Sequence, residues 1–127
     1  MGNIVYVQQD NWQSIESSAK PVLVDFWAEW CPPCRLLAPT FERLAANYGN
    51  EINFAQVNVD EYPELASQYD IRSIPTLLLL RQGEVLEQLV GARPYQALAR
   101  ILDQYVSASP SLPPRTTTPA LASGLEG

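Results

Sequence analysis

The chain has 127 residues, a formal net charge of −6 and 46% hydrophobic residues, which favours one domain with an apolar core. The sequence has no basic run, no apolar run near the ~20 residues of a membrane-spanning helix, and no secretory-type start. We therefore expect a monomer in the cytoplasm that binds neither nucleic acid nor membranes.

The first half of the chain predicts two strands and two helices. A strand over 3–7 precedes a helix over 10–18, and a second strand covers 21–28. That second strand is apolar almost throughout, which is typical of a strand covered on both faces. A helix is predicted over 31–48, with this apolar stripe at helical spacing: Leu36, Leu37, Phe41, Leu44 and Ala45.

The second half predicts three strands and two helices. A strand over 52–59 leads to a short helix over 63–69. Strands over 75–80 and 85–90 read as a hairpin, and an amphipathic helix over 94–106 follows them. Strands that alternate with helices and end in a hairpin predict an α/β fold with a mixed sheet covered on both faces.

The composition changes at residue 107. Residues 107–127 are rich in Pro, Ser and Thr and poor in large apolar side chains. Such a segment cannot bury enough apolar surface to fold alone. We therefore expect a folded domain over 1–106 and a disordered tail over 107–127.

The candidate reactive residues are Cys31 and Cys34, the only two cysteines of the chain, and the chain contains no His. A Cys–His or Ser–His nucleophile pair is therefore excluded, and a closed zinc site would lack its usual ligands. The pair follows a strand and begins a helix, where the helix dipole favours a thiolate. A permanent structural disulfide that closes so short a loop would stabilise the folded protein little. The spacing predicts a redox-active dithiol in which Cys31 attacks and the less exposed Cys34 resolves.

Around this motif, the sequence resembles the thioredoxin family over residues 3–106. The segments that carry the resemblance are 24–34, 58–60, 71–76, Gly83 and 90–92. The resemblance implies the thioredoxin fold, a five-stranded central sheet flanked by four helices. It also implies a protein-disulfide reductase that uses its own disulfide and no other cofactor, with a thioredoxin reductase as electron donor and protein disulfides as substrates.

Asp25 is an ionisable residue within the most apolar predicted strand. Burial disfavours the charged carboxylate, so we expect a raised pKa for Asp25. The resemblance implies that Asp25 accepts the proton of Cys34 during resolution. Many members of the family place a Lys where this chain has Gln56. Our hypothesis is that the missing cation raises the pKa of Asp25 further and weakens its action as a base at neutral pH.

The resemblance also implies a substrate groove beside the dithiol. Pro75 matches the cis-proline of the family, and an incoming peptide would pair with backbone groups of Ile74. Trp27, Trp30, Gly91 and Ala92 match positions that build or rim this groove. We expect Trp30 to be exposed and Trp27 to pack mainly in the core.

Pro32 departs from the family pattern, which has Gly at this position. It removes a backbone N–H from the helix start, and Pro33 after it disfavours a helical conformation of residue 32. The N–H groups of Cys34 and Arg35 stay available to the sulfur of Cys31. The loss of the backbone N–H at residue 32 raises the pKa of the Cys31 thiol. A stiffer segment between the two cysteines changes the relative strain of the dithiol and disulfide forms. The direction in which the redox potential moves is therefore left open.

Two other functions use the same kind of domain. A disulfide oxidase or isomerase carries other residues between its cysteines, and a non-catalytic binding subunit needs no dithiol chemistry. The sequence has no secretory-type start and no substrate-binding insertion, which favours the reductase.

Overall fold

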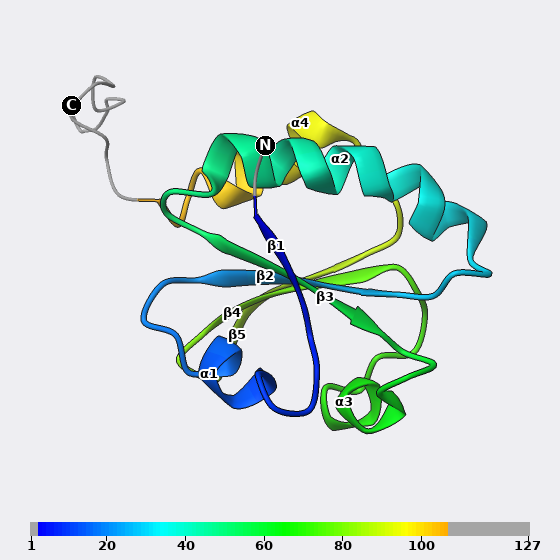
Figure 1. The fold of residues 1–127 in the computed structure, drawn as a ribbon. Helices are drawn as coiled ribbons and strands as arrows, with labels where there is room; N and C mark the ends of the chain where they lie inside the picture. Colours follow the sequence, from blue (N-terminus) through cyan, green and yellow to red (C-terminus); the bar gives the residue numbers. More distant parts are fainter. Residues whose placement is uncertain (1–2, 107–127) are drawn as a thin grey trace, which may run out of the picture.

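The computed structural model describes residues 3–106, and the predicted tail over 107–127 lies outside them. Its strands and helices follow the predicted order (Figure 1). They are β1 (Ile4–Tyr6), α1 (Trp12–Glu16), β2 (Val22–Trp27), α2 (Pro32–Tyr48), β3 (Asn53–Asn58), α3 (Pro63–Gln68), β4 (Thr76–Arg81), β5 (Glu84–Val90) and α4 (Tyr95–Leu102).

The five strands form one mixed sheet in the order β1-β3-β2-β4-β5. Strands β1, β3 and β2 are parallel, whereas β4 runs antiparallel to both β2 and β5. Strand β2 therefore lies in the centre with a hydrogen-bonded neighbour on each side. At the β4–β5 hairpin, Gln82 and Gly83 both have positive φ, 51° and 82°. Positive φ at both turn residues suits the tight turn of a twisted hairpin.

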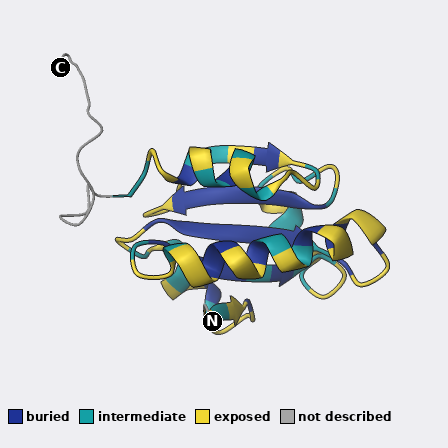
Figure 2. Ribbon diagram, turned by 90° about the horizontal axis from the view of Figure 1, so that it is seen from above, coloured by how far each residue is buried: buried dark blue, intermediate teal, exposed yellow. Residues whose placement is uncertain are grey.

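Helices cover both faces of the sheet, with α2 and α4 on one face and α1 and α3 on the other (Figure 1), and Figure 2 shows the dark blue, buried strands beneath the helices of the first face. Side chains alternate along β2, so Leu23 packs beneath α2 and α4 while Val24 and Phe26 pack toward α1 and α3. The predicted α/β class and the covering of both faces are confirmed.

Helix α2 begins one residue later than predicted, because Cys31 caps it from an extended conformation. The predicted stripe is wrong at Leu36, whose side chain is 74% exposed. Leu37, Phe41, Leu44 and Ala45 are buried, at spacings that stay on one face of a helix. Leu36 lies about 100° around the helix from Leu37 and falls outside that face.

The other three helices are also shorter than predicted, α3 by one residue and α1 and α4 by more. Helix α4 ends at Leu102, with Asp103 as its C-cap, rather than near Val106. Pro94 precedes α4 in an extended conformation, and Leu98 and Leu102 are its buried residues. Helix α1 covers only the middle of the segment predicted as helical. Within the described part of the chain, no helix has both the length and the apolar character needed to cross a bilayer.

Phe41 joins α2 to the sheet and gives a test of the core. Its buried ring meets Phe54 of β3 edge-on, with the ring centroids 5.4 Å apart. We expect Phe41→Ala to lower the free energy of unfolding in urea by about 3–5 kcal/mol, because a large buried ring leaves a cavity. Leu36→Ala on the same helix is the control, with a change within about 0.5 kcal/mol. Equal losses in both variants would contradict this packing.

Candidate active site

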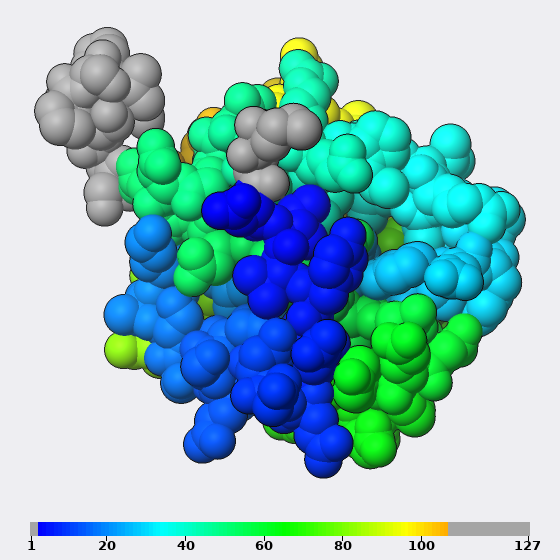
Figure 3. Space-filling model, in the orientation of Figure 1, coloured from blue at the N-terminus to red at the C-terminus, as the bar shows by residue number. Residues whose placement is uncertain are grey.

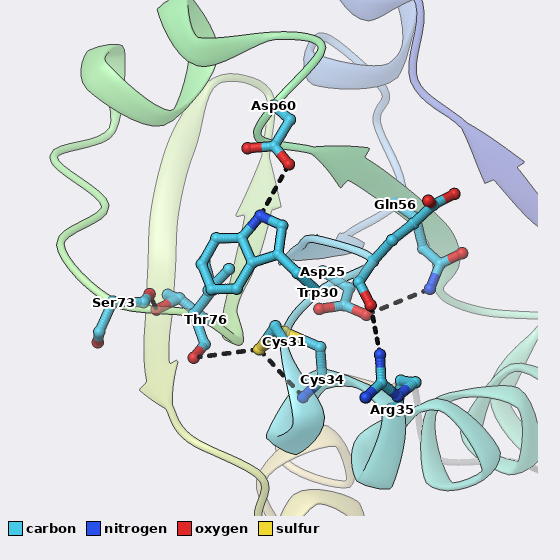
Figure 4. Close-up of a disulfide and its surroundings, with 11 residues drawn as sticks. Asp25, Trp30, Cys31, Cys34, Arg35, Gln56, Asp60, Ser73 and Thr76 are labelled. Atoms are coloured by element: carbon cyan, nitrogen blue, oxygen red, sulfur yellow. Dashed lines mark hydrogen bonds between the residues drawn. A yellow bond between two sulfur atoms is a disulfide. The ribbon is translucent and has the colours of Figure 1, made fainter.

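A disulfide joins Cys31 and Cys34 at the junction of β2 and α2. Cys31 is the N-cap of α2, Cys34 lies in its first turn, and their Cα atoms are 5.3 Å apart. Figure 4 shows the sulfur atoms between the end of β2 and the loop that leads into β4. The strand order brings this loop to the disulfide, because β4 is the direct neighbour of β2.

Two backbone groups face the sulfur of Cys31. The Cys34 N–H donates to Cys31 Sγ over 3.3 Å, and the carbonyl oxygen of Ile74 lies 3.7 Å from the same sulfur. A backbone N–H at a helix N-terminus stabilises a thiolate there. The expected difference in exposure is not present, since Cys31 is 3% and Cys34 is 4% exposed. Their hydrogen bonds and neighbours, rather than their exposure, therefore distinguish the two sulfurs.

Pro32 and Pro33 form the first turn of α2, so the expectation that residue 32 avoids a helical conformation is wrong. The first helical positions need no backbone donor, and the fixed φ of proline suits them. The backbone N–H of Arg35 was expected to be available to the sulfur of Cys31. This expectation is also wrong, because that N–H donates to the carbonyl oxygen of Cys31 over 3.2 Å. The Cys34 N–H is thus the first backbone donor of α2 and the one directed at the sulfur.

Asp25 lies behind the disulfide in the middle of β2 and is 1% exposed. Gln56 is its partner residue on β3 and donates from Nε2 to Asp25 Oδ2 over 3.2 Å (Figure 4). Burial raises the pKa of Asp25 to about 7, and the hydrogen bond from Gln56 offsets part of this shift. Asp25 is therefore poised to gain or lose a proton near neutral pH.

Pro75 lies next to the disulfide, and the Ile74–Pro75 peptide bond is cis, as the resemblance implied. Gly91 donates its N–H to the carbonyl oxygen of Pro75 over 2.8 Å. Gly91 has a φ of 94°, a conformation that residues with a side chain rarely adopt, which accounts for glycine here. Ala92 follows it and is exposed. The loop before β4 and the loop after β5 thus meet beside Cys31.

The exposure expected for Trp30 is confirmed, whereas Trp27 is only half-buried and lies outside the two main core clusters. Trp30 is 63% exposed, and its indole N–H donates to Asp60 Oδ2 over 2.8 Å. Trp27 is half-buried and packs against Ala28 and the two cysteines. The exposed Trp30 ring forms one wall beside the disulfide, and Figure 4 shows it between Asp60 and Thr76, the first residue of β4.

Two contacts at the site were not predicted from the sequence. Asp60 anchors the Trp30 ring, and Arg35 donates from its guanidinium to the carbonyl oxygen of Glu29 across the active-site loop. Asp60 follows the carboxyl end of β3, the strand beside β2, and this placement was the signal that could have indicated it. For Arg35, no pattern in the sequence indicated its carbonyl partner.

The site's own redox group is the disulfide, which needs no bound cofactor to exchange electrons. Among residues 3–106, no group of three or more Cys, Asp or Glu side chains is arranged to hold a metal ion. The arrangement suits thiol–disulfide exchange, with a sulfur beside a helix N-terminus and a buried carboxyl behind its partner.

Known proteins resemble this chain in sequence and in structure. Residues 3–104 match the thioredoxin family. Thioredoxin 2 of Chlorobaculum tepidum is 45% identical over 106 residues, which span 83% of this chain and 97% of that protein. The solved structure of Malassezia sympodialis thioredoxin (Mala s 13) superposes with a TM-score of 0.76 at 30% identity, covering 83% of this chain and 92% of that one.

Plant relatives are longer than the matched region. The chloroplastic thioredoxin M5 of Oryza sativa subsp. japonica is 46% identical over 106 residues, or 83% of this chain, and the match spans 62% of its length. The chain thus covers less than two thirds of this relative. With a family match over most of its length and a fold of the same kind, the chain belongs to the thioredoxin family.

Proposed function

We propose that this protein reduces protein disulfides through a reversible Cys31–Cys34 dithiol/disulfide pair. The observation that carries the proposal is the Cys34 N–H aimed at Cys31 Sγ at the N-terminus of α2. This arrangement stabilises a thiolate on Cys31 and places the second thiol within bonding distance. The described disulfide is then the oxidised product of the cycle.

The cycle begins with Cys31 as nucleophile. Its thiolate attacks one sulfur of the substrate disulfide, a mixed disulfide forms, and the other substrate sulfur leaves as a thiolate. Cys34 then attacks Cys31 Sγ, which forms the Cys31–Cys34 bond and releases the second substrate sulfur. Two electrons pass from the dithiol to the substrate. A thioredoxin reductase is the proposed donor that returns them.

Asp25 is proposed to take the proton of Cys34 before the second step. Asp25 and Cys34 line the same cavity behind the disulfide, together with Gln56. With a pKa of about 7, the Asp25 carboxylate is present in part at neutral pH and becomes the main form above it. Resolution is therefore expected to become faster as the pH rises through 7.

The substrate is proposed to bind beside Pro75 as an extended segment. The carbonyl oxygen of Ile74 lies 3.7 Å from Cys31 Sγ, so a peptide paired with this backbone would bring its disulfide to the nucleophile. Trp30, Gly91 and Ala92 surround this position, and Trp30 offers an exposed aromatic face. Trp27 packs against both cysteines, and Pro33 lies between them in the first turn of α2.

We place the protein in the cytoplasm, where reducing conditions would maintain its dithiol. The chloroplast is the alternative, because the rice M5 and maize M-type relatives are chloroplastic by name. Immunodetection in separated cell compartments distinguishes the two.

Trapping tests the roles of the two cysteines. In Cys34→Ser the mixed disulfide cannot be resolved, so we expect substrate proteins to stay bound through Cys31, and Cys31→Ser to trap none. Both variants should lose insulin reduction measured with a reductase. Trapping through Cys34 in Cys31→Ser would reverse the assignment. Insulin reduction that persists when both residues are Ser would contradict a redox function, whereas partner binding that persists would favour a binding subunit.

Replacing the buried carboxyl tests its protonation. The pKa of Asp25 is higher in the folded protein, about 7, than in the unfolded chain, so folding stability falls as the pH rises from about 4 to 7. Asp25→Asn removes this loss, and we expect it to raise the free energy of unfolding at pH 8 by roughly 4 kcal/mol, with little effect near pH 4. Urea unfolding at both pH values measures this, and Asp10→Asn controls for one lost charge. An equal effect at both pH values would contradict a raised pKa.

Gln56→Lys tests the departure from the family pattern. A cation at the position of Nε2 favours the charged carboxylate, so we expect the pKa of Asp25 to fall by about 1 unit or more. Carboxyl ¹³C NMR titration of both reduced proteins measures it, with Gln56→Met as the uncharged control. A pKa near 3.9 in the unsubstituted protein would refute the hypothesis.

A further inference from the structure

A cavity of about 220 Å³ lies behind the disulfide, on the side where Asp25 is buried. The residues that line it are Tyr6, Asp25, Trp27, Cys34, Arg35, Ala38, Glu42 and Gln56. Oδ2 of Asp25 accepts from Gln56, whereas Oδ1 is buried and has no hydrogen-bond partner among residues 3–106. A buried carboxyl oxygen without a protein partner beside a cavity of this size favours water at that position.

The cavity leads outward between β1 and α2. Tyr6 and Glu42, two of its lining residues, also line a groove on the surface together with Asn3, Ile4, Pro39, Arg43 and Ala46. Both shared residues are exposed. Figure 3 shows this front face, where the blue side chains of β1 lie beside the cyan part of α2. The cavity therefore has a polar outer end that faces solvent.

The spacing of three residues on α2 builds one wall of the cavity. Cys34, Ala38 and Glu42 are each four residues apart, so they lie along one face of the helix. Ala38 has the smallest side chain of the three and leaves space between the buried sulfur and the exposed carboxylate. Glu42 is the one carboxylate besides Asp25 among the lining residues, and no hydrogen bond or ion pair within the described range engages it.

The cavity and the substrate groove lie on different sides of the disulfide. None of the lining residues is one of the proposed groove residues Trp30, Ile74, Pro75, Gly91 and Ala92. Figure 4 shows Gln56 and Arg35 on one side of the disulfide, and on the other side the loop of Ser73 that leads into β4 at Thr76. A substrate bound over that loop would cover its own side and leave the β1–α2 side open.

We propose that this cavity is the passage through which the proton taken up by Asp25 reaches solvent, and that Glu42 is the positioning residue at its outer end. This inference rests on the proposed function, in which Asp25 takes the proton of Cys34. The protonated Asp25 gives its proton to water in the passage and becomes a carboxylate again. The Glu42 carboxylate accepts a hydrogen bond from that water and orients it, and the proton leaves along the water to solvent. No electron moves in this step.

The other groups that face the passage do not supply a second acceptor of this kind. The Arg35 guanidinium is a donor engaged with the carbonyl oxygen of Glu29, and the Gln56 amide donates to Asp25. Tyr6 contributes a phenol from β1. Facing Asp25 from β4, Leu77 is apolar. Glu42 is thus the residue whose carboxylate can accept a hydrogen bond from water at the outer end.

The exchange rate of the Asp25 proton tests the passage. In the full-length oxidised protein near pH 7, relaxation dispersion of the Asp25 carboxyl ¹³C resonance measures exchange between its protonated and ionised forms. We expect Glu42→Gln to slow this exchange several-fold, and Ala38→Leu, which fills the cavity, to slow it as well. Glu84→Gln, a matched loss of one exposed charge in β5, should leave it unchanged. An unchanged rate in Glu42→Gln would overturn the proposal.

A second measurement distinguishes a failure of the proposed proton passage from a failure of the proposed function. Reduced protein mixed with Ellman's reagent releases one aromatic thiolate when Cys31 attacks and a second when Cys34 resolves. Asp25→Asn should slow only the second release. An unchanged second release would overturn the role of Asp25 and the passage with it. A slowed second release with wild-type exchange in Glu42→Gln would overturn the passage alone.

Discussion

The central position of β2 is the constraint on which the rest of the site depends. This strand hydrogen-bonds to β3 on one side and to β4 on the other, and its residues are covered on both faces. A polar side chain on such a strand has no route to bulk water except along the chain direction or through a cavity. The sheet thereby imposes burial on Asp25 and directs the chain, at the end of the strand, into the N-terminus of α2.

Two opposing electrostatic environments result within one short segment. At Cys31 the helix N-terminus and the Cys34 N–H favour negative charge on sulfur. At Asp25 the apolar surroundings disfavour negative charge, and one hydrogen bond from Gln56 compensates only in part. These two environments match the proposed roles, in which the Cys31 sulfur attacks as a thiolate and the Asp25 carboxyl exchanges a proton during resolution by Cys34. In that proposal the two steps differ in their electrostatic surroundings, even though both sulfurs are almost equally buried.

Much of the fold followed from patterns in the sequence, and the errors have physical causes. Hydrophobic periodicity and the order of elements predicted the α/β class, and each predicted element is present. Leu36 was predicted in the apolar stripe of α2 but is exposed, because each residue along a helix turns the side chain by about 100° and the buried face follows Leu37. The sequence predicts a non-helical conformation for residue 32, yet the first turn of a helix tolerates proline because its backbone donors have no partner within the helix.

The sequence by itself determined the cysteine pair, the buried carboxyl and the element that carries each, because these depend on local spacing along a strand and a helix. Only the tertiary structure decided which distant groups meet them. The Ile74 carbonyl reaches Cys31, the Asp60 carboxylate reaches Trp30, and Glu42 shares a cavity with Asp25. Such contacts depend on strand order and on helix packing over the sheet. Both bring together segments that are far apart in the chain, and no periodic pattern in the sequence indicates them.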